Sequence, residues 1–484
     1  MSKNNKDKDI KGITAEKDEL SEWYTQILQK AELIEYTDVS GAYILRPGAY
    51  FIWEKVKEFF DNKIKKDGVK NASFPLLISK SNLMREQEHV EGFTPEVAWV
   101  TRSGSTELAE PLAVRPTSET VIYPAYSKWI RSWKDLPLRL NQWCNVVRWE
   151  FNNPVPFIRS REFLWQEGHT AFETREQADS EVRKIQDFYV DVYKEMYAIP
   201  VIKGIKTDKE KFAGADYTST VEAFLPSGKA AQGATSHLLG QNFAKAFDIQ
   251  FLDKNGKKQY VWQNSWGIST RSIGIAIMTH SDDKGLILPP KVAETQIIIV
   301  PIFNKKSEKS LILNKAKEIK ESLSEFRVEI DAREDHSPGY KFNDWEMKGV
   351  PLRIEIGPRD LAEDKAVLVR RDNKLKEDVK IKDIDSKVKK TLETIHKFLY
   401  NKAKKFIKDN TEESKDMKSL IAAIKNKKLV RACWDGSLES EDWIKDKTGG
   451  AKIICIIDEK IRPNDKCVYS GKKAKFVVYI GKSY

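Results

Sequence analysis

Apolar side chains first recur at helical spacing between residues 16 and 35. The positions are Leu20, Trp23, Tyr24, Ile27, Leu28 and Ala31. Recurrence every three or four residues predicts an amphipathic helix with one buried face. The preceding residues 1–15 are polar and charged and have no apolar core of a secretory signal, so we expect a disordered leader there.

After this helix, the chain up to residue 288 carries many short strand-like runs that are rich in Trp, Phe, Pro and Gly. Together with the helix, these runs predict one α+β domain over residues 16–288, built on an antiparallel sheet. The stretch "GLILPPKVAE" (285–294) is rich in Gly and Pro and marks the end of this domain.

Beyond this boundary, buried strands alternate with amphipathic helices. The expected elements are a strand at "TQIIIVPI", a helix over 307–325, a strand at "FRVEIDAR", a short helix over 338–348, a strand at "PLRIEIG", a hairpin turning at Asp372-Asn373 and a helix over 385–407. Such alternation predicts an α/β domain with a mixed sheet over residues 289–408. The Lys-rich remainder, residues 409–484, predicts a small α+β C-terminal domain.

One stretch of the first domain, "REFLWQEGHTAF" (161–172), has an unusual alternation. If it is a strand, Arg161, Phe163, Trp165, Glu167 and His169 share one face. Core faces seldom carry Arg, Glu and His, and water-facing strands seldom carry Phe and Trp in a row. This face is therefore expected to line a binding pocket.

Neighbouring stretches carry similar mixtures of residues. In "NVVRWEF", Arg148 and Glu150 alternate, and the polar loop "NNPVPFIRS" joins this stretch to the first one. An antiparallel hairpin would bring both residues near Phe163 and Trp165. "AVRPTSET" and "QGATSHLLGQNF" are also crowded with polar residues, and "WQNSWGISTRSIGIAI" places Arg271 before a run that could be a buried helix.

Each stretch has an ordinary structural interpretation when it is taken singly. An Arg-x-Glu pair is more often a surface ion pair, and a lone buried His or Trp more often belongs to the core. Several arginines, two carboxylates and several rings on inward faces are harder to explain in this way. Together they indicate a pocket that binds a flat group, a polyanionic group and a small cationic group.

Composition narrows the class of protein. The net charge of +11 favours a polyanionic partner such as nucleic acid, although a solvated Lys-rich surface gives the same charge. The sequence contains no run of about 18 apolar residues, so no membrane span is predicted. Four scattered cysteines, Cys144, Cys433, Cys455 and Cys467, are too few for a disulfide framework, so we expect a reducing, cytoplasmic setting.

The stretches "RWEF…RSREFLWQEGHT", "RPTSE", "TSHLLGQNF" and "NSWGISTR" resemble the signature motifs of the archaeal/eukaryotic-type prolyl-tRNA synthetases. The resemblance continues through "DHSPGYKFNDWEMKGVPLRIEIGPRDL" to the final "SY" and covers nearly the whole chain after the leader. It implies a class II catalytic domain, an anticodon-binding domain and a C-terminal module. It also implies that L-proline is attached to tRNA(Pro) by way of prolyl-adenylate, with ATP and Mg²⁺.

The resemblance assigns roles to individual residues. The implied ATP-binding residues are Arg148, Glu150, Arg159, Phe163, Gln232, Thr235 and Arg271. The implied proline-binding residues are Thr117, Glu119, Arg148, Trp165, Glu167, His169, His237 and Ser269, with His237 also toward the tRNA end. Arg148 and Arg271 are the implied catalytic residues, because charge develops on phosphate oxygens and an arginine fork meets these oxygens in pairs.

Two departures concern segments that relatives carry. The interval between His169 and Arg271 is too short for the large editing domain of the bacterial form, so cysteine activation is expected without correction in cis. In the C-terminal module, the places of four zinc-binding cysteines hold Asp435, Ser440, Cys467 and Ser470. Because structural zinc requires thiolate or imidazole ligands, zinc is not expected.

The resemblance also predicts partners. Within "KFNDWEMKGVPLRIE", Glu346, Lys348 and Arg353 are candidate readers of the anticodon guanines, although a surface helix followed by an edge strand explains them equally well. Pro75 in "NASFPLLIS" matches the class II dimer-interface proline and implies a homodimer.

Two rival functions remain open from the sequence. One is a class II ligase of the same subgroup for threonine or glycine, which the Thr117-x-Glu119 pair beside "LWQEGHT" disfavours. The other is a non-catalytic, synthetase-like RNA-binding protein. Loss of Arg148 or Arg271 would have favoured that alternative, and both are present.

Overall fold

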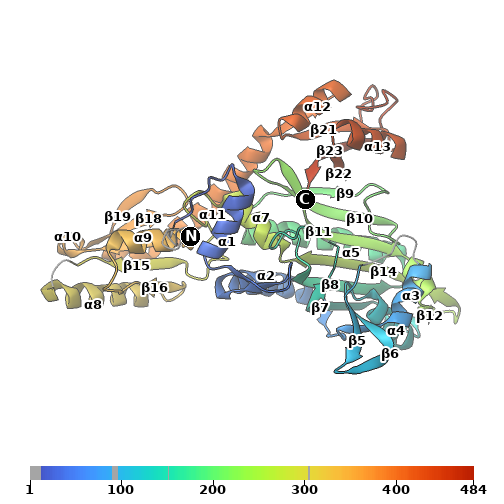
Figure 1. Cartoon of the computed structure of the whole chain (residues 1–484), viewed down its shortest axis with the longest axis horizontal. Helices are drawn as coiled ribbons and strands as arrows, with labels where there is room; N and C mark the ends of the chain where they lie inside the picture. The colour runs from blue at the N-terminus through green and yellow to red at the C-terminus, as the bar shows by residue number, and fades with distance from the viewer. Residues whose placement is uncertain (1–11, 90–95, 151, 304–305) are drawn as a thin grey trace, which may run out of the picture.

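The computed structural model describes residues 12–89, 96–150, 152–303 and 306–484 (Figure 1). A central body of sheet and helices joins a second unit, which runs from α8 (Lys306–Ser322) to α11 (Ile384–Asp409) (Figure 1). A third unit is formed around α12 (Met417–Lys425) and α13 (Leu438–Lys447). Among the described residues, no helix is both long enough and apolar enough to cross a bilayer.

Eleven strands form the main sheet, in the order β20-β21-β23-β22-β9-β10-β11-β14-β8-β7-β3. Their bounds, in this order, are Thr411–Ser414, Leu429–Trp434, Phe476–Ser483, Lys452–Ile457, Ile202–Ile205, Tyr217–Phe224, Lys229–Gly240, Trp262–Ser269, Glu162–Phe172, Leu138–Val147 and Lys70–Asn71. From β9 to β7 every neighbouring pair is antiparallel, as predicted for the first domain.

Helices α1 (Leu20–Lys30), α2 (Pro47–Lys66), α5 (Arg175–Asp191) and α7 (Arg271–His280) share one hydrophobic core with the central strands. Phe60 of α2 stacks on Tyr189 of α5 with ring centroids 5.0 Å apart. The Tyr189 hydroxyl donates to the Gln166 amide oxygen of β8 at 2.9 Å. One face of β8 is thereby fixed against the helices, and the alternate residues are left to the opposite face.

The alternation of β8 is unbroken through Gly168. Its pairing register continues without a shift from Trp165 to Phe172 on the β14 side and from Glu162 to Ala171 on the β7 side. A Cβ atom on Gly168 would lie 2.2 Å from the Trp266 ring, so only glycine fits beneath that ring. His169 therefore shares a face with Phe163, Trp165 and Glu167, as the sequence predicted.

Several boundaries differ from the sequence predictions. The first helix, expected over 16–35, spans only Leu20–Lys30. Of the expected leader, residues 1–11 lie outside the described residues, whereas Thr14 donates its N–H to Gln26 at 2.8 Å and Ala15 is buried. Strand β7 ends at Val147, so Arg148 and Glu150 lie in the connection rather than in the hairpin strands.

The remaining elements of the central body are short. They are β1 (Ile34–Tyr36), β2 (Tyr43–Leu45), β4 (Leu77–Ser79), α3 (Lys80–His89), β5 (Trp99–Ser103), β6 (Thr106–Val114), α4 (Glu119–Trp129), a 3₁₀ turn (Trp133–Asp135), α6 (Asn242–Ala246), β12 (Gln250–Leu252), β13 (Lys258–Tyr260) and a π turn after α5 (Val192–Met196). The interval 173–270, all of it described, forms helices, sheet strands and one small hairpin, and it contains no inserted domain.

The second unit has the predicted mixed sheet, in the order β16-β15-β17-β18-β19. Strand β15 pairs in parallel with β16 and β17, and the β17–β18 and β18–β19 pairs are antiparallel. The bounds are β15 (Ile297–Pro301), α8 (Lys306–Ser322), β16 (Val328–Ile330), α9 (Pro338–Met347), β17 (Leu352–Ile356), α10 (Pro358–Ala362), β18 (Lys365–Arg370), β19 (Lys376–Lys380), a 3₁₀ turn (Ile381–Asp383) and α11 (Ile384–Asp409).

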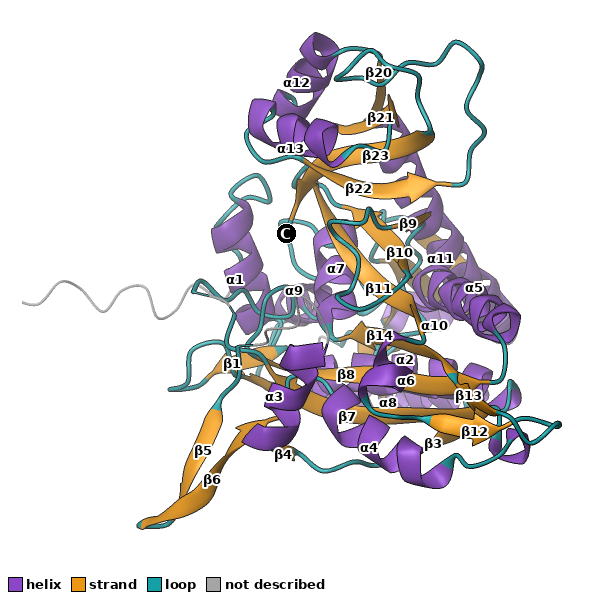
Figure 2. Cartoon of the chain, turned by 90° about the vertical axis from the view of Figure 1, so that its right-hand side faces the viewer, coloured by secondary structure: helices purple, strands orange, loops and turns teal. Residues whose placement is uncertain are grey.

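The third unit adds α12 (Met417–Lys425) and α13 (Leu438–Lys447) to strands β20–β23. Its strands continue the central sheet, which the sequence did not predict. Ile456 of β22 pairs with Ile205 of β9, and the end of β23 pairs in parallel with Lys229 and Ala230 of β11. Figure 2 shows this unit stacked above the central strands, with the C-terminus beside β11.

Candidate active site

A cavity of about 280 Å³ opens on the face of the central sheet opposite the helical core. Twelve of the fourteen sequence-predicted ATP and proline residues line it: Thr117, Glu119, Arg148, Phe163, Trp165, Glu167, His169, Gln232, Thr235, His237, Ser269 and Arg271. Because these residues come from β8, β11, β14, the start of α4, the start of α7 and the turn after β7, only the folded sheet brings them together.

Two arginines give one end of the cavity its charge. The Arg148 guanidinium lies 5.1 Å from the Trp165 ring and 5.6 Å from the Phe163 ring, and its Nε donates to the Pro116 carbonyl at 2.9 Å. Arg271 begins α7, and its Nε donates to the Ile158 carbonyl at 3.0 Å. Both side chains are held with donors still available, as recognition of an anion requires.

The Arg271 environment is strongly positive. Burial is the main effect that lowers the pKa of Arg271, and the nearby charges of Arg148 and Arg159 lower it further. Tyr193 and Glu222 oppose this shift. Three clustered cations repel one another until an anion of several charges enters, so this end of the cavity fits a polyphosphate.

Glu150 and Arg159 are the two predicted residues that do not line the cavity. Both are exposed, and both lie in the long connection between β7 and β8. The sequence suggested a longer β7 that would carry Glu150 inward, but the strand ends at Val147. Glu150 therefore does not face the cavity in this structure, whereas Arg159 is close enough to affect the pKa of Arg271.

The opposite end of the cavity holds two buried carboxylates. Thr117 donates its hydroxyl to Glu119 at the start of α4. Glu167 is 2% exposed and lies 2.9 Å from His169, measured between Oε2 and Nε2. The other ring nitrogen of His169 lies 3.1 Å from the Tyr123 hydroxyl.

The protonation states at this end follow from the contacts. Burial opposes ionisation of Glu167, but the hydrogen bond and charge of His169, with the bonds from Ser118 and Gln142, outweigh it and lower the pKa of Glu167. Burial likewise lowers the pKa of His169, but the Glu167 bond and the Glu119 and Glu167 charges raise it on balance. Two carboxylates beside one imidazole leave an excess of acidic groups at this end, which suits a single small cation.

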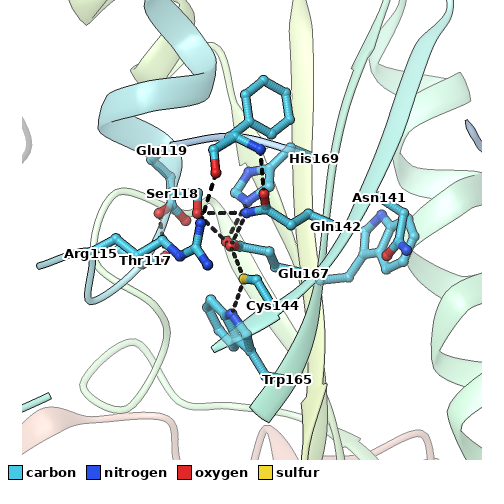
Figure 3. Close-up of polar contacts among 12 residues, drawn as sticks. Arg115, Thr117, Ser118, Glu119, Asn141, Gln142, Cys144, Trp165, Glu167 and His169 are labelled. Atoms are coloured by element: carbon cyan, nitrogen blue, oxygen red, sulfur yellow. Dashed lines mark hydrogen bonds and ion pairs between the residues drawn. The ribbon is translucent and has the colours of Figure 1, made fainter. Parts of the chain in front are cut away.

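Three residues behind Glu167 were missed by the sequence analysis (Figure 3). Oε1 of Glu167 accepts hydrogen bonds from the Ser118 hydroxyl at 2.5 Å and the Gln142 amide at 3.0 Å, and the Cys144 thiol lies 3.5 Å away. Gln142 and Cys144 alternate on β7 and pair with Glu167 and Trp165 of β8. Their period-two spacing in "NQWCNVV" was a usable signal, but the strand register was unknown.

His237 lies at the β11 side of the cavity. Its Nδ1 is 2.8 Å from the Thr218 hydroxyl, its Nε2 is 3.1 Å from the Thr235 hydroxyl, and its ring centroid is 4.7 Å from that of Phe212. Burial, helped by the charge of His169, lowers the pKa of His237 to about 3. The ring is therefore neutral. Phe212 and its neighbour Glu210 also line the cavity, in a loop that the sequence analysis did not single out.

Glu119, Glu167 and His169 are the only three His, Cys, Asp or Glu residues among the described ones whose ligand atoms lie within 4.8 Å of one another. Their geometry fits a hydrogen-bonded cluster better than a metal site. The Nε2 of His169 faces a carboxylate oxygen at 2.9 Å, so this nitrogen carries a proton rather than a free lone pair. The ligand set therefore does not fit a metal ion.

The anticodon candidates lie around α9 and β17. Arg353 is buried, donates to Glu355 at 2.9 Å and to Glu346 at 3.1 Å, and lies over the Phe342 ring. Lys348 forms an ion pair at 3.3 Å with Glu32 of the central body. Neither cation points freely into solvent, so binding of a base here would require these pairs to rearrange.

Arg371 connects the same region to the central body. Its Nε donates to the Glu346 carbonyl at 3.0 Å, and its two terminal nitrogens donate to Asp282 at 3.0 and 2.6 Å. Asp282 lies just after α7 in sequence. A fork of this kind fixes the second unit against the segment after α7.

In the third unit, Asp435, Ser440 and Ser470, three of the four positions where relatives carry zinc-binding cysteines, form a hydrogen-bonded cluster. The Asp435 carboxylate accepts from the hydroxyls of Ser470, Ser440 and Ser437 at 2.6, 2.7 and 2.9 Å. It also accepts from the Ser437 backbone N–H at 3.0 Å. A carboxylate saturated by hydroxyl donors does not fit zinc, which requires thiolate or imidazole ligands.

Comparison with known proteins accounts for all three units. The tRNA synthetase class II core domain (G, H, P, S and T) matches residues 99–280, the anticodon binding domain matches 296–391, and the prolyl-tRNA synthetase C-terminal domain matches 417–484. The chain is 51% identical to a cytoplasmic proline–tRNA ligase of Arabidopsis thaliana, over 100% of this chain and 94% of that protein. It is 48% identical to a proline–tRNA ligase of Clostridium botulinum, over 98% of both chains.

A solved structure is similarly close. Prolyl-tRNA synthetase from Cryptosporidium parvum, complexed with halofuginone and AMPPNP, superposes with a TM-score of 0.94 at 48% identity, covering 98% of this chain and 100% of that one. The predicted fold class, an antiparallel class II core followed by a mixed-sheet anticodon-binding domain and a small C-terminal domain, is confirmed. About half of the residues are identical to those of these proteins, over nearly the whole length of each chain. This chain therefore belongs to the prolyl-tRNA synthetase family of class II aminoacyl-tRNA synthetases.

Proposed function

We propose that this chain attaches L-proline to tRNA(Pro) in two ATP-dependent steps. The observation that carries the proposal is the division of a single cavity into an arginine end and a carboxylate end. Proline and ATP have matching charges: a cationic imino group on one substrate and a triphosphate on the other. Family membership supports this assignment over a ligase for threonine or glycine.

In the first step, a proline carboxylate oxygen attacks the α-phosphorus of ATP, and the bond to the bridging oxygen of pyrophosphate breaks. No general base is needed, because the carboxylate is ionised at neutral pH. Arg148 holds the carboxylate and the α-phosphate, while Arg271 and Arg159 hold the outer phosphates. Phe163 packs against adenine, and Gln232 and Thr235 contact the ATP ribose and phosphates. ATP enters as its Mg²⁺ complex.

Proline binds at the carboxylate end. Thr117 and Glu119 receive the imino group, and Trp165, Glu167 and His169 surround the ring. Ser269 and neutral His237 complete this side of the cavity. The carboxylates of Glu119 and Glu167 give this end the sign of charge that pairs with the positive imino group.

In the second step, a hydroxyl of the terminal tRNA ribose attacks the prolyl carbonyl and AMP leaves. His237 lies toward the tRNA end. Glu346, Lys348 and Arg353 are proposed to read the anticodon guanines once the Arg353–Glu346 and Lys348–Glu32 ion pairs open. Cysteine is close to proline in volume, and the interval between β8 and α7 holds no editing domain. We therefore expect cysteine to be activated and not corrected in cis.

The remaining proposals concern the setting of the enzyme. It is expected to act in the cytoplasm and as a homodimer with Pro75 in the interface, as class II enzymes with this motif do. Zinc is not expected in the C-terminal domain, because Asp435 and its hydroxyl donors use the positions that zinc ligands would need.

ATP–pyrophosphate exchange by the purified chain, scanned over single amino acids, tests the proposed function. We expect exchange with proline and weaker exchange with cysteine. Exchange with threonine or glycine alone would agree with a class II synthetase fold but would overturn the assignment of proline as the substrate. Absence of exchange with every amino acid would favour the non-catalytic RNA-binding alternative. An Arg271→Ala variant serves as the inactive control.

A further inference from the structure

Gln142 occupies a position behind the proline end of the cavity where every hydrogen bond has a fixed direction. Its side chain is 2% exposed. The amide oxygen accepts the Phe74 backbone N–H at 2.6 Å, and the amide nitrogen lies 3.0 Å from Glu167 and 3.1 Å from the Ser118 hydroxyl. Because a backbone N–H can only donate, Phe74 fixes which end of the amide faces Glu167.

The direction of the bond at Phe74 determines the others. With its nitrogen turned toward Glu167, Gln142 presents donors to both the carboxylate and Ser118 (Figure 3). Ser118 then accepts from Gln142 and has its own proton free for Glu167, at 2.5 Å. Oε1 of Glu167 thus receives two ordered hydrogen bonds and the weaker contact of the Cys144 thiol, and Oε2 faces His169. These bonds favour the ionised carboxylate, because each donor stabilises its negative charge.

The segment that orients Gln142 is itself held. Arg115 donates to the Phe74 carbonyl at 2.8 Å and to the Asn145 carbonyl of β7 at 2.9 Å. The same guanidinium therefore fixes the distance between the Phe74 segment and the strand that carries Gln142. Phe74 immediately precedes Pro75, the proposed dimer-interface residue. The side-chain amide of Gln142 therefore connects the Phe74–Pro75 segment to the proline end of the cavity.

We propose that Gln142 is a positioning residue for proline specificity: it acts through Glu167, holding this carboxylate ionised and aimed at the proline ring. This inference rests on the proposed function. Gln142 does not line the cavity, and its hydrogen-bond partners are Phe74, Ser118 and Glu167 rather than the arginines of the ATP end. Its loss should therefore raise the KM for proline and leave the KM for ATP nearly unchanged.

The isosteric variant Gln142→Glu separates positioning from packing. It keeps the acceptor for the Phe74 N–H but replaces the donor toward Glu167 with an oxygen. Two adjacent buried carboxylates cannot both ionise easily, so the introduced carboxyl group should restore the hydrogen bond only when it is protonated. We expect the KM for proline to rise about 10- to 100-fold at pH 8, the usual effect of losing a hydrogen bond to a charged group, and to recover as pH falls toward 6.

The measurement is proline-dependent ATP–pyrophosphate exchange between pH 6 and 8, with KM determined separately for proline and ATP. Gln142→Met, which carries no charge and no donor, should raise the KM for proline without acid recovery, and it remains informative if Gln142→Glu does not fold. Gln166→Glu is the matched control, because Gln166 is a buried amide of β8 on the helical side of the sheet.

The outcomes are distinguishable. If the wild-type chain shows no proline exchange, the proposed function fails, whatever the variants do. If the wild type is active and Gln142→Met keeps its KM for proline, the positioning role is wrong. Equal rises in the KM for proline and for ATP would indicate general damage and would also overturn it. Acid recovery in Gln142→Glu but not in Gln166→Glu supports it.

Discussion

Replacement of Asp435 by alanine tests whether a carboxylate, rather than a metal ion, holds the C-terminal domain together. Asp435 lies after β21 and joins two loops through its four accepted hydrogen bonds. The Ser437 and Ser440 bonds hold the turn into α13, and the Ser470 bond holds the loop before β23. The carboxylate therefore links the two loops through side-chain hydrogen bonds that alanine cannot make.

The size of the stability loss in Asp435→Ala depends on which hydrogen-bond donors can find new acceptors. Ser440 already lies 2.9 Å from the Ser437 carbonyl, and the Ser437 and Ser440 hydroxyls are 3.0 Å apart, so these two can rebond. The Ser470 hydroxyl and the Ser437 N–H lose their acceptor. At about 1.5 kcal/mol for each bond to a charged group, the opening free energy of the loops should fall by about 3 kcal/mol.

Hydrogen–deuterium exchange measures this opening directly. A loss of about 3 kcal/mol should speed exchange in peptides covering residues 434–440 and 467–474 roughly a hundredfold. Exposed Asp446 of the same domain supplies the control, and Asp446→Ala should leave these peptides unchanged. If the wild-type chain shows the same acceleration when a strong zinc chelator is added, or if Asp435→Ala shows none, the carboxylate explanation is wrong.

The same cluster makes a prediction about pH. Burial opposes ionisation of Asp435, but the bonds from Ser470, the Ser437 N–H, Ser440 and the Ser437 hydroxyl together hold its pKa well below the usual range. A group whose pKa is lower in the folded state stabilises that state above its unfolded pKa, which is about 3.9. Loop protection should therefore be constant from neutral pH down to about 5 and should fall at more acidic pH. A decline centred near pH 6 or 7 would point to a different group.

Three further variants test the site and the sheet. Arg271→Ala should lower kcat/KM for ATP in pyrophosphate exchange about 10²- to 10³-fold. Arg271→Lys should give an intermediate value, because lysine keeps the charge but not the planar guanidinium. An unchanged kcat/KM would show that Arg271 does not bind the phosphates. Glu119→Gln should raise the KM for proline roughly tenfold or more with little change for ATP, and the opposite selectivity would contradict its assignment to the imino group. Gly168→Ala should reduce stability by about 3 kcal/mol in denaturant unfolding, because its Cβ would overlap the Trp266 ring, whereas Gly339→Ala, with open space around it, should not.

Local patterns predicted the elements of the second unit closely, because each strand and helix there carries its own periodicity and turn residues. The expected hairpin at Asp372-Asn373 lies between β18 and β19, and the helix expected over 385–407 spans Ile384–Asp409. The face of β8 was also predictable, since a strand fixes alternate side chains to one side. These predictions needed no information about distant parts of the chain.

Predictions that depend on register or on tertiary pairing were weaker. Glu150 was expected in the pocket because the pattern gave no signal that β7 ends at Val147. Gln142 was missed because its importance depends on facing Glu167, which the register of two strands decides. The joining of the C-terminal domain to the central sheet depends on a single residue pair, Ile456 with Ile205, and on the end of β23, neither of which has a local signature.

The continuity of the main sheet also affects how the molecule avoids self-association. Without β22 and β23, strand β9 would be an edge strand, with unpaired N–H and C=O groups along Ile202–Ile205 available to another chain. The C-terminal domain pairs with this edge at Ile205 and packs Cys455 and Ile456 against Gly204. Proteolytic removal of this domain should therefore cause aggregation of the remaining catalytic domain, in addition to any effect on chemistry, because the exposed edge can pair with its counterpart on a second molecule.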